Sequence, residues 1–168
     1  MTSETLMPPA AEAVAEWLLT CAIWDEGQAK EEWSTQGVTL VQCGRRFCAI
    51  RLPLPLVNSA ADNDDPWTVD TYLETALHGA PVFRGVTGQW LYALVESSGA
   101  ARWEVHGIEC IRDQQLGVPR PDLIGYPGRT ASYWAVPISR PGELGTASAV
   151  SQLVAHGRYR VAQREGAR

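Results

Sequence analysis

Gly37-Val-Thr-Leu-Val-Gln-Cys-Gly-Arg-Arg-Phe-Cys-Ala-Ile-Arg-Leu-Pro53 is the most informative stretch of this chain for its architecture. Its two apolar runs, 38–42 and 47–52, are rich in residue types that favour strands, and the segment 43–46 between them is typical of a turn. The sequence therefore predicts a β-hairpin that ends at Pro53, because proline cannot donate a hydrogen bond to a strand ladder. No Asp or Glu occurs between Glu32 and Asp62, and the polar residue near the end of the second strand is Arg51.

Apolar residues at helical spacing predict four helices outside this stretch, over residues 10–24, 54–61, 66–78 and 147–156. Asp65-Pro66 is typical of a capped helix start, and Gly79 and Gly157 are expected to stop the third and fourth helices. Further strands are predicted over residues 81–84, 89–95, 105–111, 116–119 and 132–137. This order of elements predicts a single α+β domain over residues 1–157, with a mainly antiparallel sheet packed by helices. Residues 158–168 are expected to form a loosely ordered basic tail.

The charge balance limits the classes of partner. The formal net charge is −5, and residues 1–33 hold seven acidic side chains against the single base Lys30. An acidic chain is poorly suited to nonspecific duplex binding, which depends on neutralising several phosphates. No apolar run is long enough to span a membrane, and the start of the chain does not resemble a signal peptide, so we expect a cytoplasmic protein without membrane contact.

Four cysteines, Cys21, Cys43, Cys48 and Cys110, are expected to be thiols rather than disulfides in such a protein. Cys43, Cys48, His106 and Cys110 also offer four side chains of the types that zinc accepts. If residues 105–111 form a strand, however, His106 and Cys110 lie about 13 Å apart, too far to share one ion. We therefore expect buried thiols and no metal, while a Cys/His hydrolase pairing remains open on sequence alone.

Several segments together resemble one known family, the bifunctional DNA primase/polymerase N-terminal domain of the archaeo-eukaryotic primase superfamily, and most closely its short actinobacterial forms. The segments are Gly37–Val41, Phe47–Pro53, Pro81–Gly85, Gly88–Val95, Leu116–Asp122 and Tyr133–Pro137. The resemblance covers most of residues 33–157 and depends on the order of these segments and on their pattern of apolar residues. It implies a palm-like sheet.

The resemblance also implies three catalytic signatures, and each is defective in this chain. The family's paired acids fall on Ala49–Pro53, which contains Arg51 and no carboxylate. Its histidine falls on Trp90, and its later acid falls in 116–122, where only Asp122 remains. Because phosphoryl transfer needs carboxylates to hold divalent ions, the resemblance predicts a domain without this catalysis and without a cofactor.

A non-catalytic module that acts through a protein partner or as a homodimer is the first functional hypothesis. Seven tryptophans support it, since Trp and Arg are enriched at interface hot spots, although Trp17, Trp33, Trp103 and Trp134 are expected mainly to fill the core. The alternative is a nucleotide or single-stranded nucleic-acid binder that uses the relict cleft. The candidate residues of that cleft are Arg51, Trp90, Arg84, Arg120 and Asp122. A third hypothesis is an enzyme of unrecognised chemistry.

Overall fold

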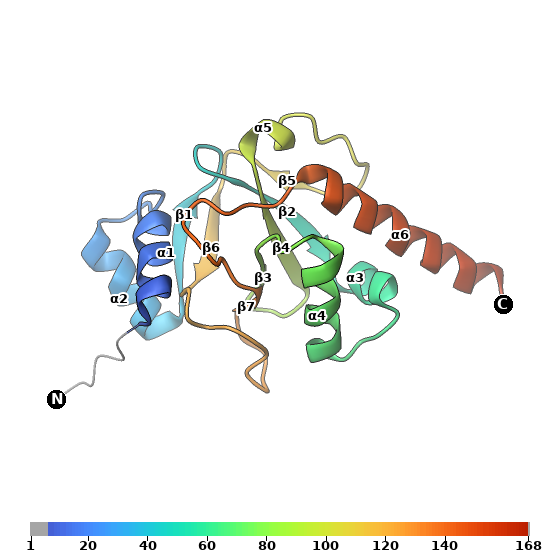
Figure 1. Ribbon diagram of the computed structural model, residues 1–168, viewed down its shortest axis with the longest axis horizontal. Coiled ribbons are helices and arrows are strands. Elements are labelled where there is room, and N and C mark those ends of the chain that lie inside the picture. Colours follow the sequence, from blue (N-terminus) through green and yellow to red (C-terminus); the bar gives the residue numbers. More distant parts are fainter. Residues whose placement is uncertain (1–6, 168) are drawn as a thin grey trace.

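A computed structural model describes residues 7–167 as a single α+β domain built around a five-stranded antiparallel sheet (Figure 1). The sheet has the order β5-β2-β4-β3-β7, and a separate pair, β1-β6, lies beside it. The strands are β1 (Val38–Gln42), β2 (Cys48–Pro53), β3 (Val82–Arg84), β4 (Trp90–Val95), β5 (Cys110–Ile111), β6 (Gln115–Pro119) and β7 (Tyr133–Val136). The helices are α1 (Pro9–Leu19), α2 (Glu26–Gln36), α3 (Leu54–Ala61), α4 (Pro66–Ala76), α5 (Ser97–Ala100) and α6 (Ala147–Gly166).

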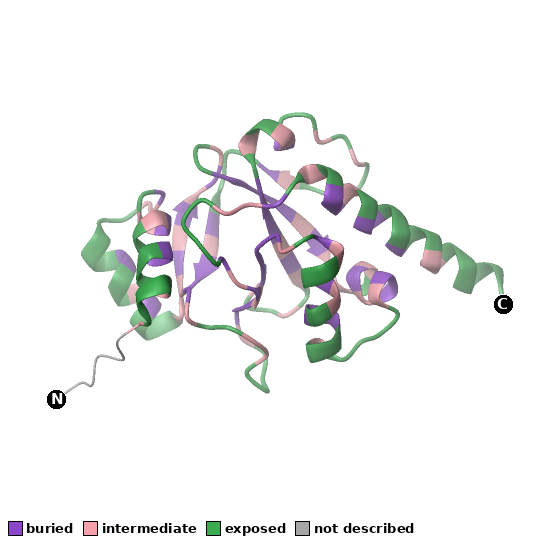
Figure 2. Ribbon diagram, in the orientation of Figure 1, coloured by how far each residue is buried: buried purple, intermediate pink, exposed green. Residues whose placement is uncertain are grey.

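Each face of the large sheet contributes to a different core. Ile50 and Leu52 of β2 and Leu91 of β4 point into a core covered by α3, α4 and α6, which lie together at the right of Figure 1. Ala49 and Leu94 point into a second core, shared with α1 and the small sheet at the left. Figure 2 shows the buried residues concentrated on the strands and on the inner sides of the helices.

The tryptophans expected to fill the core do so mainly in the second core. Trp33 and Trp134 are buried, and their indole N–H groups donate to the carbonyls of Val118 and Pro119, at 3.0 and 3.1 Å. Trp17 and Trp103 are half-buried and pack against the two cores. These hydrogen bonds give each buried indole N–H an acceptor in place of the water that burial excludes.

The predicted β-hairpin is wrong, although both of its strands exist. β1 pairs antiparallel with β6, whereas β2 pairs with β4 and β5. Gly44, at φ +116°, turns the chain out of the β1 direction, and the N–H of Cys43 donates to the carbonyl of Gln114. The apolar pattern predicted strands correctly, but it carries no information on a partner about 75 residues away.

Helix α2 was not predicted, because only Ala29 and Trp33 of its eleven residues are buried. Its ends nevertheless carry clear signals. The Asp25 carboxylate accepts a hydrogen bond from the N–H of Gln28 at 2.9 Å, and Gly37 ends the helix in the left-handed conformation. Asp65 caps α4 in the same way, as the sequence predicts, by accepting from the N–H of Thr68. The expected helix over 10–24 is shorter, ending at Leu19.

Two further expectations need correction. Of the predicted strand 105–111 only Cys110 and Ile111 are extended, because the chain turns at Gly107, whose φ is +78°. Gly157 does not stop the last helix: α6 continues to Gly166, so residues 158–166 are helix rather than a loose tail. Residues 1–6 of the predicted domain and Arg168 of the predicted tail lie outside the described residues.

The extension of α6 has a physical cause. Arg160 and Arg164 reach the carboxylate of Asp62 just beyond α3, at 3.7 and 2.9 Å. Gly157 lies buried where α6 crosses α3, and the missing side chain permits this close approach. No helix in the described part of the chain is both long and apolar enough to cross a bilayer.

Gly157→Ala is expected to destabilise the protein by about 1–3 kcal/mol, although alanine is the better helix former. A β-carbon at position 157 would lie 2.8 Å from the backbone oxygen of Leu56, so α3 and α6 would have to separate. Gly166→Ala is the matched control, since nothing lies within 4 Å of its β-carbon, and it should not destabilise. Urea unfolding measures both changes. Equal stabilities for the two variants would contradict the close helix crossing.

Candidate functional site

Arg51 and Trp90 of the predicted cleft lie in contact on one face of the sheet. β2 and β4 are paired so that Pro53 faces Trp90, which places Arg51 diagonally opposite the indole on the same face. The Arg51 guanidinium carbon is 3.7 Å from the centre of the Trp90 ring, within the range of a cation–π interaction. Arg51 also forms a 3.5 Å ion pair with Glu109 and keeps 34% of its side chain exposed. The guanidinium therefore covers one face of the indole.

Arg84 lies on the opposite face of the sheet from Arg51. It pairs with Leu91 of β4, whose side chain enters the core under α3, α4 and α6. Arg84 Nη2 lies 3.6 Å from Oδ1 of Asp70 on α4, and both side chains are more than nine-tenths buried. The structure therefore does not bring Arg84 together with Arg51 and Trp90.

Arg120 and Asp122 lie just after β6 and bind each other, with 2.7 Å between Arg120 Nε and Asp122 Oδ1. The backbone N–H of Arg120 donates to the carbonyl of Gly37 before β1. The predicted cleft residues are thus distributed over the Arg51–Trp90 stack, the buried Arg84 and the Arg120–Asp122 pair after β6.

A buried polar network that the sequence did not predict connects α4 with β3 and β7. Tyr133 Oη donates a 2.8 Å hydrogen bond to Asp70 Oδ2, and Asp70 also faces Arg84. Ser132 Oγ donates to the carbonyl oxygen of Arg84 at 2.6 Å. The only sequence signal was Asp70 itself, an acid among the apolar positions of the helix that spans it.

Burial controls the protonation of this network. It raises the pKa of Asp70, while the hydrogen bond from Tyr133 and the charge of Arg84 act in the opposite direction. Burial and the neighbouring Asp70 carboxylate raise the pKa of Tyr133, so its hydroxyl stays protonated and remains a donor. Because the folded-state pKa of Asp70 is raised, its ionisation reduces stability as the pH rises above the ordinary carboxyl range.

Removal of one partner of this network is expected to cost more than removal of both. Asp70→Leu should destabilise by about 3–5 kcal/mol, since it leaves the Arg84 charge buried without its carboxylate. The double variant Asp70→Leu/Arg84→Met should recover part of that loss, because no buried charge remains. Chemical denaturation of the two variants and the wild type tests this order. A double variant less stable than Asp70→Leu would show that the unpaired Arg84 charge is not the main cause of the loss.

The four cysteines are free thiols, of which Cys21, Cys43 and Cys48 are buried. Burial raises the pKa of Cys43 from 9.0 to about 12 and raises the pKa values of Cys21 and Cys110. The strand argument against zinc does not hold, since His106 is not in a strand. Within residues 7–167, however, no group of three or more His, Cys, Asp or Glu side chains is placed to hold a metal ion.

Cys43→Ala should reduce the alkaline sensitivity of the protein. Because the thiol pKa is about 9 in the unfolded chain and about 12 in the folded one, the unfolded chain loses its proton first as the pH rises. The wild type therefore loses about 1.4 kcal/mol of stability per pH unit above about pH 9 through this group, and the variant does not. Urea unfolding should show that the difference in unfolding free energy between the wild type and Cys43→Ala is smaller at about pH 10 than at about pH 8. A constant gap would contradict the shifted pKa.

Exposed apolar side chains lie around a hollow of about 450 Å³ beside the loop after β6. We call this the apolar hollow; its lining includes Val86, Leu123, Ile124, Tyr126, Arg129 and Asp122. The loop is fixed to the sheet edge, because the N–H of Trp134 donates to the carbonyl of Leu123 at 2.7 Å. Asp122 is the only member of the predicted site that lines this hollow.

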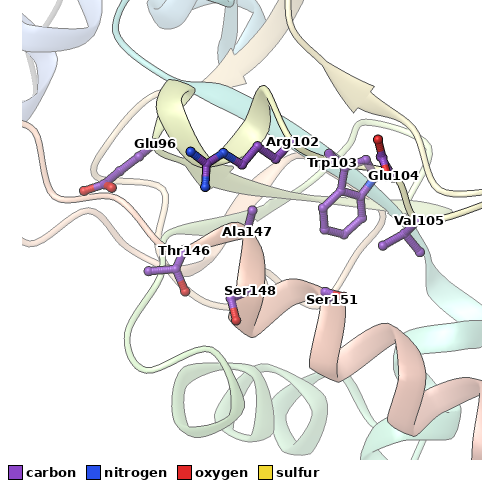
Figure 3. A pocket seen from close by; sticks show the side chains of 10 residues that line it. Glu96, Arg102, Trp103, Glu104, Val105, Thr146, Ala147, Ser148 and Ser151 are labelled. Atoms are coloured by element: carbon purple, nitrogen blue, oxygen red, sulfur yellow. The ribbon is translucent and has the colours of Figure 1, made fainter.

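Another hollow, of about 520 Å³, lies between α5 and the start of α6 (Figure 3). Arg102 and Trp103 extend over it from the α5 side, and Ser148 and Ser151 line it from α6. Neither a histidine nor a cysteine belongs to its lining, and its acidic side chains are Glu96 and Glu104.

Comparison of the chain with protein-family models, with curated proteins and with solved structures found no match.

Proposed function

We propose that the chain is a non-catalytic primase/polymerase-like module that binds a protein partner through the apolar hollow. The observation that carries the proposal is the grouping of exposed apolar side chains. Of the six large apolar residues exposed among residues 7–167, Val86, Leu123 and Ile124 line the hollow, and Trp67 contacts its wall. Contiguous exposed apolar surface of this kind marks protein interaction sites.

The wall of the apolar hollow is preorganised. Trp67 meets the ring of Tyr126 edge to face at 6.4 Å, and Tyr126 lies 6.0 Å from the buried Tyr133. Tyr133 in turn is held by Asp70. A rigid aromatic wall loses little conformational entropy on binding, so more of the contact energy contributes to affinity.

The charged residues of the lining indicate the chemistry of the partner. Asp122 is already paired with Arg120. Arg129, by contrast, is exposed and has no hydrogen bond or ion pair with any residue of the described chain. The unmatched charge beside the apolar surface is therefore positive. A partner segment with apolar side chains next to an Asp or Glu fits both features.

The residues at the expected catalytic positions support a module without phosphoryl transfer. Arg51 stands where the resembled family carries acids, and Trp90 stands where it carries histidine. Their cation–π contact and the Arg51–Glu109 pair form a self-contained surface cluster. A cation at this position repels the divalent ions that the reaction needs. The alternative of base stacking is less favoured, because the Arg51 guanidinium already occupies one of the two faces of the indole.

A random peptide library selected against the full chain tests this function. Enriched peptides should combine apolar residues with Asp or Glu, and Ile124→Asp should weaken their binding at least about tenfold, as expected for an interface hot spot. Tyr159→Asp is the matched control, since Tyr159 is 61% exposed and Ile124 57%, and Tyr159 lies on α6 outside the hollow. Fluorescence polarisation with labelled peptides measures the affinities.

Three outcomes would overturn parts of the proposal. Equal peptide binding by Ile124→Asp and the wild type would remove the hollow as the binding site. A concentration-dependent dimer in sedimentation analysis, dissociated by Ile124→Asp, would make a second copy of the chain the occupant. Manganese-dependent primer synthesis by the wild type would show that the module is catalytic.

A further inference from the structure

A third hollow, of about 660 Å³, lies between the end of α1 and the loop that joins β1 to β2. We call it the arginine hollow, because Arg45, Arg46 and Arg112 line it together with the single carboxylate Asp113. It shares no lining residue with the apolar hollow. Three arginines against one aspartate give the arginine hollow a positive formal charge, in a chain whose net charge is −5.

The backbone that presents these arginines is held in place. Gly44 packs so closely on the Arg112 backbone that a β-carbon at this position would clash with the Arg112 carbonyl oxygen. The N–H of Gly44 donates to the carbonyl of Phe47 at 2.8 Å, and Ser97 Oγ donates to the carbonyl of Gly44 at 3.2 Å. The loop between β1 and β2 is thus fixed at its glycine.

The Arg112 guanidinium is fixed as well. Its Nε and Nη2 atoms donate to the carbonyls of Ala100 and Trp103, both at 3.0 Å. These acceptors are neutral, so the guanidinium charge is not cancelled by them. Arg112, which belongs to the lining of the hollow, therefore carries a permanent positive charge at a defined position.

Arg45 and Arg46 carry charges that the described chain does not neutralise. Arg51, Arg84 and Arg120 each pair with a carboxylate. In contrast, Arg45 and Arg46 are exposed and make no hydrogen bond or ion pair with any residue between 7 and 167. Two adjacent guanidinium groups repel each other, and a bound anion would relieve that repulsion.

The other polar groups of the hollow do not supply this anion. Asp113 Oδ1 accepts a 3.1 Å hydrogen bond from Gln42 Nε2, and one carboxylate cannot balance three guanidinium groups. The thiols of Cys21 and Cys43 also border the hollow, and burial raises their pKa values, so they are neutral near pH 7.

We propose that the arginine hollow binds the phosphate group of a small phosphorylated molecule. Guanidinium forks match the oxygens of a phosphate monoester, whose near-dianionic charge can meet more than one arginine. The volume of the hollow exceeds that of a phosphate and leaves room for the attached organic group. Thr20 also lines a neighbouring hollow, whose lining includes Glu16 and Glu26. These two carboxylates would repel an extended polyanion that continued into it.

Calorimetric titration of the full chain at low salt tests the proposal, with pyrophosphate, ribose 5-phosphate and AMP as probes. Inorganic phosphate, unphosphorylated ribose and a single-stranded oligonucleotide are the comparison ligands. We expect the phosphorylated probes to bind and ribose not to bind. Arg45→Ala/Arg46→Ala should weaken binding at least about tenfold, as expected for the loss of charge-assisted hydrogen bonds. Circular dichroism checks that the variant is folded.

The matched control is Arg102→Ala/Arg129→Ala, which removes the same charge from two exposed arginines outside the arginine hollow. It should bind the probes within about twofold of the wild type, as should Ile124→Asp, because the two hollows are separate. The proposal is overturned if no phosphorylated probe binds at millimolar concentration, or if the control variant weakens binding equally. Binding of the oligonucleotide alone would also overturn it, in favour of a nucleic-acid site.

Discussion

The antiparallel pairing of β2 with β4 organises both cores of the molecule. Residues of both strands are buried on both faces, so alternate side chains enter the two cores. Such strands lie in the middle of a sheet and need cover on each side, which explains why helices pack on one face and the small sheet with α1 on the other. Arg51 and Trp90 lie toward one end of this strand pair, on the same face as Ala49 and Leu94.

The arginines show how position in the fold determines the role of one residue type. Arg84 is enclosed by α4 and β7 and contributes to a buried network in which charge and burial oppose each other. Arg51 lies at the surface, where Trp90 and Glu109 engage its charge. Arg45 and Arg46 lie on a turn held at Gly44 and have no such partners among residues 7–167. Of these three arrangements, only the last has charge available for a ligand.

Both proposed binding surfaces lie on loops that the cores hold in place. The apolar hollow is formed by a loop bonded along the edge of β7, and the arginine hollow by a turn bonded to Phe47 just before β2 and to Gln114 in the segment after β5. Loops positioned by a rigid scaffold can present exposed apolar or charged groups without loss of the core. The apolar hollow with its exposed Arg129 and the arginine hollow suit different ligand chemistries.

Most elements of this protein follow from its sequence, because periodicity and capping are local. Strand β1, helix α3 and the Asp65 cap depend on residues within a few positions of each other. Three features arise only when the chain folds: the pairing of β1 with β6, the helix crossing at Gly157, and the meeting of Asp70 with Arg84 and Tyr133. Which arginines form ion pairs with carboxylates is likewise decided only in the folded chain. These outcomes depend on contacts between residues far apart in the chain. A local sequence pattern does not specify which distant segment will pack beside it.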